Sequence, residues 1–392
     1  MEETGLDRFG ALAAMATAEM VTDGHPDKFC DQVADAVLDE ALKQDPRTRA
    51  GIECLAKDNL LIVSGEISTG ANLNVEEIAR HVWESVVGYG PGEELTVISH
   101  IKLQSPDIAH GGHTDPSGVA SGGAGDQGVM IGYATDETPE LLPKEYVLAR
   151  NLCQALKALR NAGDTPWLRA DGKSQVTLLG GKVKSVVLAA HHDANVSTDD
   201  VRKVLRSKVI EPVLGRHLTA SSRVVINGTG RFTIGGPKGD AGVVGRKIVV
   251  DAYGPRIPVG GGAYSGKDPS KVDRSAAYMA RHIAKAVVEN KFAKECMVVL
   301  AFGIGQKQPE MVRIMTRPHA KELERWVTDY FKDLSPEAII EYLGLRTPKG
   351  WSYCSTAAFG HYGREGFPWE RSVLLPMKKT EHVEGVGAYK QN

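Results

Sequence analysis

The apolar positions of the chain form short stretches that predict paired strands, each pair accompanied by amphipathic helices. The first block opens with a helix at about residues 26–43, in which Phe29, Val33, Val37 and Ala41 share one face. Strands at 49–57 and 59–68, a helix at 74–87 and a strand at 95–103 complete this block.

The second and third blocks repeat this arrangement. In the second, strands at 174–179 and 182–193 flank Gly180-Gly181, a pair that favours a tight hairpin turn. Helices at 144–163 and 198–214 complete the second block, and the third has strands at 246–254, 296–305 and 310–316 with helices at 269–290, 320–331 and 335–344.

Paired strands covered by helices, three times over, favour an α+β fold of three similar domains over one parallel sheet. We expect an N-terminal extension at 1–14, then an N-terminal domain at 15–110, a central domain at 129–233 and a C-terminal domain at 234–392. Residues 104–128 have no periodic apolar pattern, and a segment of that length inside a compact chain is usually functional or disordered. We interpret it as a flexible loop that gates an active site, with a passive surface loop as the alternative.

Composition narrows the class of protein. The formal net charge of −2 over 392 residues argues against a general binder of nucleic acid or membrane surfaces. No apolar run approaches the ~20 residues that span a bilayer, and residues 1–14 lack the basic start and apolar core of a signal peptide. The five cysteines are far apart and never form C-x-x-C, which fits a reducing cytoplasm.

The stretch "GGAYSGKD" at 261–268 approaches the pattern of a phosphate-binding P-loop. That loop needs a strand running directly into the glycines and a helix that starts at the lysine, followed by Ser or Thr. Here the predicted strand ends about eight residues earlier, and Asp268-Pro269 follow Lys267 as the expected N-cap and first residue of the helix. The pattern therefore disfavours a true P-loop.

Aspartates and basic residues recur together in turns marked by Gly or Pro, where binding residues concentrate. Carboxylates beside a polyphosphate repel it unless cations lie between them, and oxygen ligands such as Asp select Mg²⁺. The mixture indicates a metal–polyphosphate site, with separate solvated surface turns as the alternative. These residues are His25, Asp27 and Lys28 in "GHPDK", Asp171 and Lys173 in "RADGKSQ", Lys238, Asp240, Arg246 and Lys247 in "GGPKGDAGVVGRK", and Lys267, Lys271 and Asp273.

The motifs "GHPDK", "GAGDQG", "KSQVT", "GGPKGDAGVVGRK" and "GGGAYSGKDPSKVDRSAAY", in this order, resemble the S-adenosylmethionine synthetase (methionine adenosyltransferase) family from about residue 17 to 371. The resemblance implies three α+β domains around a pseudo-threefold axis. It also implies a homodimer, or a tetramer that is a dimer of dimers, with active sites between subunits. In the family reaction the sulfur of L-methionine attacks C5′ of ATP. The released triphosphate is hydrolysed to diphosphate and phosphate, with Mg²⁺, two ions per site, and K⁺ assisting.

A thioether carries no proton, so this reaction needs no general base for its first step and should depend on positioning and preorganised charge. The resemblance implies that His25 donates to the leaving oxygen. The catalytic residues it implies are His25, Lys173, Asp240, Arg246, Lys267 and Lys271.

The resemblance also implies the binding residues. For Phe232, expected to stack on adenine, the alternative is a core aromatic, and for Glu53 a polar residue on the outer face of its strand. ATP would contact Glu19, His25, Asp171, Lys173, Arg231, Phe232, Asp240, Arg246, Lys247, Ala263 and Lys267; methionine would contact Glu66, Gln104, Asp126, Asp240, Lys271 and Ile304; Asp27 and Asp273 would bind Mg²⁺, and Glu53 would bind K⁺.

Some features depart from the family pattern or leave other functions open. Ala18 and Met20 stand where the family often has hydroxyl residues. Two alternatives are a Mg²⁺-dependent phosphotransferase, which would release ADP, and an inactive subunit that senses ATP or S-adenosylmethionine. The "HHD" at 191–193 has no further His or Cys at ligand spacing, which disfavours zinc.

Overall fold

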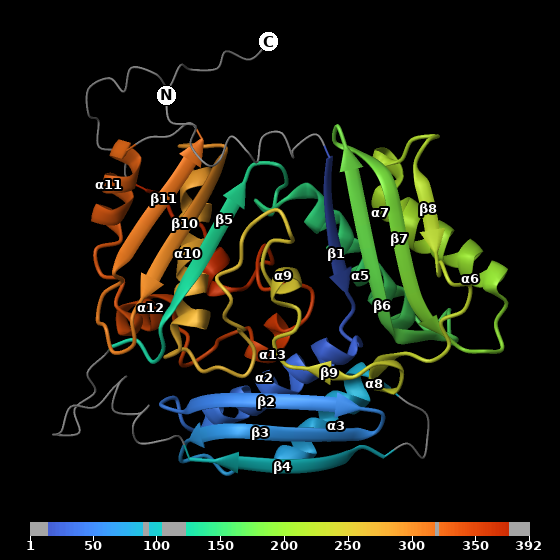
Figure 1. Cartoon of the computed structure of the whole chain (residues 1–392), viewed down its shortest axis with the longest axis horizontal. Helices are drawn as coiled ribbons and strands as arrows, with labels where there is room; N and C mark the ends of the chain where they lie inside the picture. The colour runs from blue at the N-terminus through green and yellow to red at the C-terminus, as the bar shows by residue number, and fades with distance from the viewer. Residues whose placement is uncertain (1–14, 89–93, 104–122, 318–320, 376–392) are drawn as a thin grey trace.

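The computed structural model describes residues 15–88, 94–103, 123–317 and 321–375 (Figure 1). Three β-sheets surround a helical interior, and each sheet packs against one long helix of its own block. Helix α2 (Pro26–Gln44) packs on the first sheet, α5 (Lys144–Asn161) on the second and α10 (Val272–Glu289) on the third. This repeated arrangement of helices and sheets confirms the predicted α+β fold class of three similar domains.

Most predicted helices and strands are present within a few residues of their expected ends. The 198–214 helix is interrupted, because one π-helical turn, η1 (Arg206–Ile210), separates α6 (Thr198–Leu205) from α7 (Glu211–Leu214). The other predicted elements are α3 (Val75–Val86), α11 (Lys321–Tyr330) and α12 (Pro336–Leu343), with strands β2 (Arg49–Lys57), β3 (Leu60–Ser68), β4 (Thr96–Lys102), β6 (Leu168–Leu179), β7 (Lys182–His192), β10 (Glu295–Phe302) and β11 (Met311–Arg317).

Three of the strands that the sequence pattern missed pair with strands of another block. Strand β1 (Met15–Val21) precedes α2 but pairs antiparallel with β6 of the second block. In the same way β5 (Gly128–Thr135) pairs with β10 of the third block, and β9 (Gly242–Val243) pairs with β2 of the first. Each block therefore lends its first strand to another block's sheet, and the exchange closes in a ring of three.

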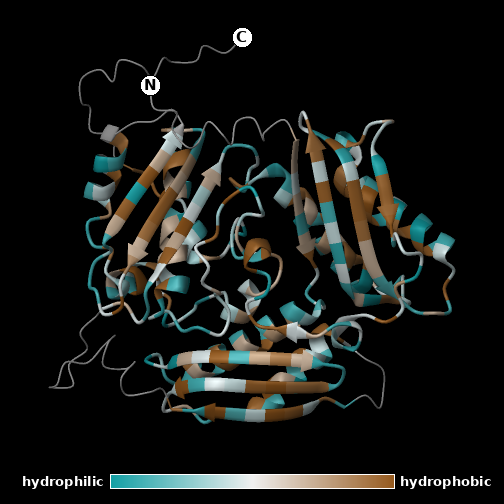
Figure 2. Ribbon diagram, in the orientation of Figure 1, coloured by the Kyte–Doolittle hydropathy of each residue, from teal (hydrophilic) through white to brown (hydrophobic). Residues whose placement is uncertain are grey.

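The three sheets share one plan. An antiparallel hairpin forms the centre of each, and the lent strand pairs antiparallel with the hairpin's first strand. In two sheets a further strand runs parallel to the hairpin's second strand: β4 beside β3, and β8 (Arg223–Ile226) beside β7. Burial alternates along β6, and its apolar and polar bands are visible in Figure 2. One face of this sheet therefore packs on the interior.

Two local predictions are wrong. Residues 246–254 do not form a strand but include one helical turn, α9 (Ile248–Asp251), which directs the buried Asp251 carboxylate onto the ammonium of Lys28 at 2.5 Å. Burial and this ion pair override the strand preference of the valines. Asp268 does not cap α10, which begins at Val272 after Lys271. Its carboxylate instead accepts from the backbone N–H of Ala50 in β2, at 2.8 Å.

Helix α2 carries four aspartates at intervals of four residues, which places them along one face. Each accepts hydrogen bonds from backbone N–H groups of the third block, beyond residue 240. We call these four residues the aspartate ladder. Asp27 accepts from Val243 at 2.9 Å, Asp31 from Gly245 at 2.9 Å, Asp35 from Gly266 at 2.9 Å, and Asp39 from Tyr353 and Cys354 at 2.8 Å each.

A second buried ion pair fixes α10 to the chain's C-terminal segment. The guanidinium of Arg281 donates to both carboxylate oxygens of Glu370, at 3.0 and 2.9 Å. It also donates to the backbone carbonyls of Tyr133, Glu140 and Leu141. Arg281 is fully buried, so this one side chain joins β5, the turn after it and the C-terminal segment.

Replacing Arg281 by methionine should destabilise the fold by about 3–5 kcal/mol, because it leaves the buried Glu370 carboxylate without its cation. The measurement is chemical denaturation of the full chain. Arg346→Met is the matched control, because its partner Glu337 is half exposed and such a pair contributes about 0–1 kcal/mol. Equal losses for the two variants would contradict the role given to Arg281.

Candidate functional site

His25 caps the N-terminus of α2. Its Nδ1 accepts from the backbone N–H of Asp27 at 3.2 Å, so the neutral ring carries its proton on Nε2. Burial, and then the positive charge of Lys247, lower the pKa of His25 from 6.5 to about 4. At neutral pH the site therefore holds an uncharged imidazole with one N–H donor.

The segment that precedes His25 is fixed to strand β6. The Thr22 hydroxyl donates to the carbonyl of Ala170 at 2.7 Å, and the Thr22 backbone N–H donates to that of Gly172 at 2.9 Å. A side chain at Gly24 would put its Cβ 2.3 Å from the Cβ of Ala170, so only glycine fits there. These contacts bring His25 beside the part of β6 that carries the predicted site residues.

Asp27 lies under two basic residues of the turn after β9. Its buried carboxylate accepts from Lys247 Nζ at 2.5 Å and lies 3.6 Å from Arg246 Nη1. Burial opposes ionisation, but the hydrogen bonds from Lys247 and Val243 outweigh it and keep the pKa of Asp27 below its usual value. Asp27 is therefore an anion under neutral conditions.

Strand β6 contributes an acidic and a basic residue to the same region. Asp171 accepts from the backbone N–H of Gly236 at 2.7 Å, and burial raises its pKa to about 6, with smaller contributions from Asp240 and Asp27. Lys173 forms an ion pair with Glu19 of β1 at 2.9 Å. The predicted ATP residues of β1, α2 and β6 therefore lie together.

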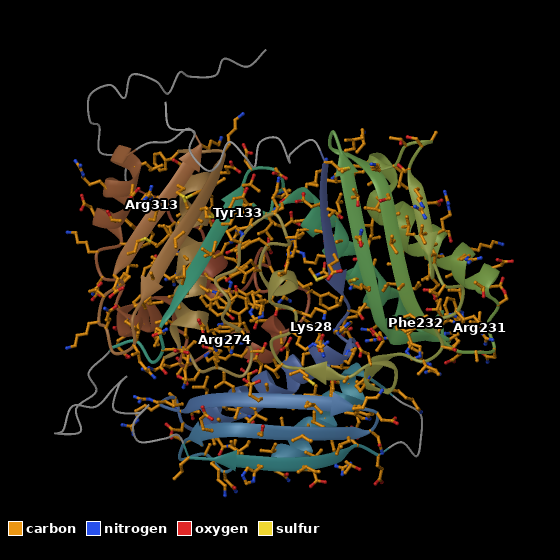
Figure 3. The ribbon with its side chains drawn as sticks, in the orientation of Figure 1. Lys28, Tyr133, Arg231, Phe232, Arg274 and Arg313 are labelled. Atoms are coloured by element: carbon orange, nitrogen blue, oxygen red, sulfur yellow. The ribbon has the colours of Figure 1, made fainter. Side chains whose placement is uncertain are left out.

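The two histidines at the end of β7 hold Phe232 in place. The ring of His191 lies 5.4 Å from that of Phe232. His192 Nε2 accepts from the Phe232 backbone N–H at 3.2 Å, which leaves Nδ1 to donate to the Asp193 carbonyl at 2.9 Å. Both nitrogens of His192 are thus occupied by protein contacts. Phe232 is half buried and Arg231 is exposed beside it (Figure 3).

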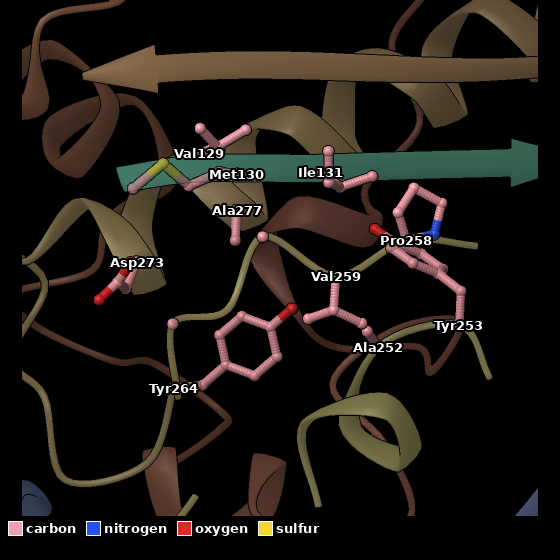
Figure 4. A pocket seen from close by; sticks show the side chains of 12 residues that line it. Val129, Met130, Ile131, Ala252, Tyr253, Pro258, Val259, Tyr264, Asp273 and Ala277 are labelled. Carbon is pink, nitrogen blue, oxygen red and sulfur yellow. The ribbon is translucent and has the colours of Figure 1, made fainter. Parts of the chain in front are cut away.

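A second group of predicted residues surrounds the start of α10. Lys267 forms an ion pair with Asp273. The Asp273 carboxylate packs against the backbone of Gly262, which has no side chain. A Cβ on Gly262 would lie 2.1 Å from that carboxylate, and Ala263 abuts Gly245 of the other glycine-rich turn. Asp273 also borders a cavity of about 10 Å³ beneath β5, which Figure 4 shows.

Two predicted glutamates lie on the same face of the first sheet, near the strand edge that pairs with Lys267. Gly51 of β2 pairs with Lys267 through an isolated bridge and lies opposite Glu66 of β3. Burial raises the pKa of Glu53, while the charge of Lys267 opposes that shift. Ile52, next to Glu53, is buried on the other face, so side chains alternate between the two faces along β2.

Of the remaining residues predicted to bind methionine, the structure describes Asp126, Lys271 and Ile304. The backbone N–H of Gly125 donates to the carbonyl of Ser270 at 3.3 Å, which brings the segment of Asp126 to the segment that precedes α10. Gly305 donates to the Ala124 carbonyl, so the exposed Ile304 lies along the same segment. Gln104 and residues 105–122 of the predicted loop lie outside the described residues.

The structure therefore gathers most of the predicted residues into two clusters, while Arg231, Phe232 and Ile304 belong to neither. Lys28 is also in neither cluster, because it is buried between Asp31 and Asp251 (Figure 3). The α2 cluster comprises Glu19, His25, Asp27, Asp171, Lys173, Arg246 and Lys247, with Asp240 near Asp171. The α10 cluster comprises Glu53, Glu66, Asp126, Ala263, Lys267, Lys271 and Asp273. Ala18 and Met20, the departures in β1, are both buried core residues.

Neither cluster is a complete metal site by itself. In the described part of the chain no group of three or more His, Cys, Asp or Glu residues is arranged to hold an ion. Asp27 and Asp273 each already contact a lysine. A metal here would take one carboxylate from the protein and its other ligands from phosphate and water, which suits Mg²⁺.

Sequence reasoning missed the residues that support these clusters. Asp31 and Asp35 hold the backbone of the turns that carry Arg246, Lys247 and Lys267, although they belong to neither cluster. Their signal was the four-residue spacing of aspartates on a helix whose other face is apolar.

Three interlocked α+β repeats bring lysines, arginines and aspartates together at glycine-rich turns, an arrangement suited to a polyphosphate substrate. The chain belongs to the S-adenosylmethionine synthetase family. Its residues 13–106 match the family's N-terminal domain, 121–232 the central domain and 234–371 the C-terminal domain.

Curated relatives agree with this assignment. The S-adenosylmethionine synthase of Treponema pallidum (strain Nichols) is 44% identical over 374 residues, which cover 91% of this chain and 93% of the relative. That of Chlorobium phaeobacteroides is 44% identical over 399 residues, covering 94% and 98%. That of Sorangium cellulosum is 43% identical over 372 residues, covering 91% and 87%.

Replacing Lys247 by methionine should raise the pKa of His25 above about 4. The substitution removes a positive charge, and it frees the Asp27 carboxylate to stabilise the imidazolium. An NMR titration of the His25 ring measures the shift. Arg231→Met, which removes an exposed charge beside Phe232, should leave the value unchanged. A His25 pKa that stays near 4 in Lys247→Met would show that burial alone sets it.

Proposed function

We propose that this chain synthesises S-adenosyl-L-methionine from ATP and L-methionine. The family assignment supports the overall reaction. The observation that carries the site assignment is the neutral His25, whose Nε2–H lies among the basic side chains of the α2 cluster. A neutral donor surrounded by fixed positive charge suits a leaving group that gains negative charge.

In the proposed first step the methionine sulfur forms a bond to C5′ of ATP, and the bond from C5′ to O5′ breaks. The electron pair of that bond leaves with O5′, and sulfur becomes a sulfonium. His25 donates its Nε2–H to the departing oxygen, while Lys173, Arg246 and Lys247 stabilise the triphosphate. Such preorganised donors act on the charge that develops in the transition state.

The triphosphate is then hydrolysed to diphosphate and phosphate. We assign its binding in the α10 cluster to Lys267, with Arg246 contributing from the other cluster. Asp240, near Asp171, stabilises the sulfonium of the product. Phe232, positioned by the two histidines of β7, stacks on adenine, with the exposed Arg231 beside it.

We assign two Mg²⁺ ions to Asp27 and Asp273 and K⁺ to Glu53. When bound, the metal ions supply positive charge that neutralises the polyphosphate. The protein's part is to hold each carboxylate ionised: basic partners and backbone N–H groups do so for Asp27. Glu53 is exposed on the sheet face where Glu66 also lies, so oxygen ligands gather there.

For methionine, we propose that Glu66 pairs with the amino group and Lys271 with the carboxylate. Lys271 Nζ contacts Asp268 at 2.5 Å, which fixes its position at the start of α10. Asp126, Asp240, Ile304 and Gln104 complete the set of methionine residues.

We also propose that two copies of the chain complete each active site, in a homodimer or in a tetramer of two such dimers. The first sheet presents one face to solvent, and that face carries apolar side chains beside the glutamates of the α10 cluster. Leu55 is 42% and Ile98 51% exposed. A second copy on this face would bury them and bring its own α2 cluster to the α10 cluster.

The cytoplasmic location of the protein stays a prediction. The five cysteines are free thiols, as expected in a reducing cytoplasm. Among the described residues no helix has the length and apolar character to cross a membrane.

The proposed reaction is tested by its products. The full chain incubated with ATP, L-methionine, Mg²⁺ and K⁺ should yield S-adenosylmethionine by mass spectrometry, with diphosphate and phosphate by ³¹P NMR. ADP in place of these products would establish the alternative of a phosphotransferase. Binding of ATP without turnover would establish the alternative of a sensing subunit.

Replacing His25 by asparagine should lower turnover by about 10²-fold or more. Asparagine keeps an oxygen where Nδ1 caps α2 but loses the Nε2–H donor, so helix α2 is preserved while the leaving-group contact is lost. Steady-state kinetics and thermal unfolding measure the two effects. His81→Asn, in α3, is the control. Near-normal turnover in His25→Asn would remove this residue from the proposed step.

A further inference from the structure

Lys267 owes its position to the backbone on either side of it. Gly266 has φ +82°, and a Cβ there would lie 2.1 Å from the carbonyl oxygen of Ile52. The carbonyl of Gly266 in turn accepts from the Ile52 N–H at 3.0 Å. The chain at Lys267 thus runs against the edge of β2 in a conformation that only glycine tolerates at the preceding residue.

Two buried charged side chains grip this short segment. Asp35 of the aspartate ladder accepts from the Gly266 N–H at 2.9 Å. Arg274 of α10 donates through Nη1 to the carbonyl of Lys267 at 3.0 Å, and through Nη2 to Asp35 at 2.7 Å. Asp35, Arg274 and the two backbone groups therefore form a closed ring around the link between Gly266 and Lys267.

The arginine in this ring has little freedom to move. Its guanidinium lies 4.6 Å from the centre of the Tyr353 ring, and both Arg274 and Asp35 are fully buried. Its Nε has no hydrogen-bond partner in the part of the chain that the structure describes. Arg274 therefore donates to Asp35 and to the Lys267 carbonyl while its own buried Nε–H stays unsatisfied. An unsatisfied buried donor costs stability, which indicates that this orientation serves a function.

We propose that Asp35 and Arg274 are positioning residues that set the reach of the Lys267 side chain toward the polyphosphate. They act through Lys267 and touch no substrate themselves. Only a planar guanidinium presents two donors at a fixed angle to two acceptors at once, so a lysine cannot replace Arg274 in this task. The inference rests on the proposed function, in which Lys267 binds the triphosphate.

The test measures the binding of inorganic tripolyphosphate to the full chain in the presence of Mg²⁺ by titration calorimetry. Arg274→Lys keeps the positive charge that pairs with Asp35 but loses the planar guanidinium that donates to two acceptors at once. We expect it to weaken tripolyphosphate about tenfold, because a displacement of the order of 1 Å at a site costs at least that much. In a Lys267→Met background the same substitution should have no further effect, since Arg274 acts only through Lys267.

The control is Arg150→Lys, because Arg150 is also buried and donates to the carbonyl of Tyr362 at 2.8 Å, away from Lys267. It should leave tripolyphosphate affinity unchanged. Thermal unfolding of each variant establishes that it is folded. If Arg274→Lys does not fold, Asp35→Asn takes its place, because asparagine keeps an acceptor for Gly266 while its amide opposes Arg274.

The outcomes distinguish a failure of the proposed role of Lys267 from a failure of the positioning role of Asp35 and Arg274. If Lys267→Met leaves tripolyphosphate binding unchanged, Lys267 does not hold the polyphosphate and that part of the proposed function fails. If Lys267→Met weakens binding but Arg274→Lys binds as the unsubstituted chain does, the positioning role fails. An equal loss for Arg274→Lys with and without Lys267 would also overturn it, because the effect would then not pass through the lysine.

Discussion

Hydrogen bonds from backbone N–H groups to the carboxylates of helix α2 are the interaction on which the rest of the site depends. Glycine-rich turns can approach a ligand closely, but they have few side chains to hold them in one conformation. The aspartate ladder supplies that constraint from outside the turns, through contacts of 2.9 Å with Val243, Gly245 and Gly266. One rigid helix therefore sets the relative positions of Arg246, Lys247 and Lys267.

The same helix explains the electrostatics of the α2 cluster. Burial, and then the positive charges of Lys247 and Lys173, disfavour a protonated His25, while hydrogen bonds from Lys247 and Val243 keep Asp27 ionised. The uncharged ring keeps its remaining donor because the other nitrogen is used by the helix cap. Local folding of the chain and the chemistry proposed for it thus depend on a single hydrogen bond at residue 25.

The sequence allowed the long helices and the hairpins to be predicted because their patterns are local. It did not reveal β1, β5 or β9, since each pairs with a strand from another block and β9 has only two residues. Motifs indicated most site residues, yet the sequence does not distinguish the environment of Lys28 from that of Lys247. Only the fold shows that Lys28 is buried between two carboxylates while Lys247 reaches Asp27. The support from Asp35 spans 231 residues, beyond any local pattern.

The ring of lent strands has a consequence for how the chain reaches its native state. The first sheet lacks β9 until residues beyond 240 have been synthesised, and β1 has no partner until β6 follows it by about 150 residues. No block can finish its own sheet alone: the second and third sheets each need a strand made earlier, and the first sheet needs one made later. Pairings across such separations slow folding, so the nascent chain exposes open strand edges that attract chaperones or neighbouring chains until the last block arrives.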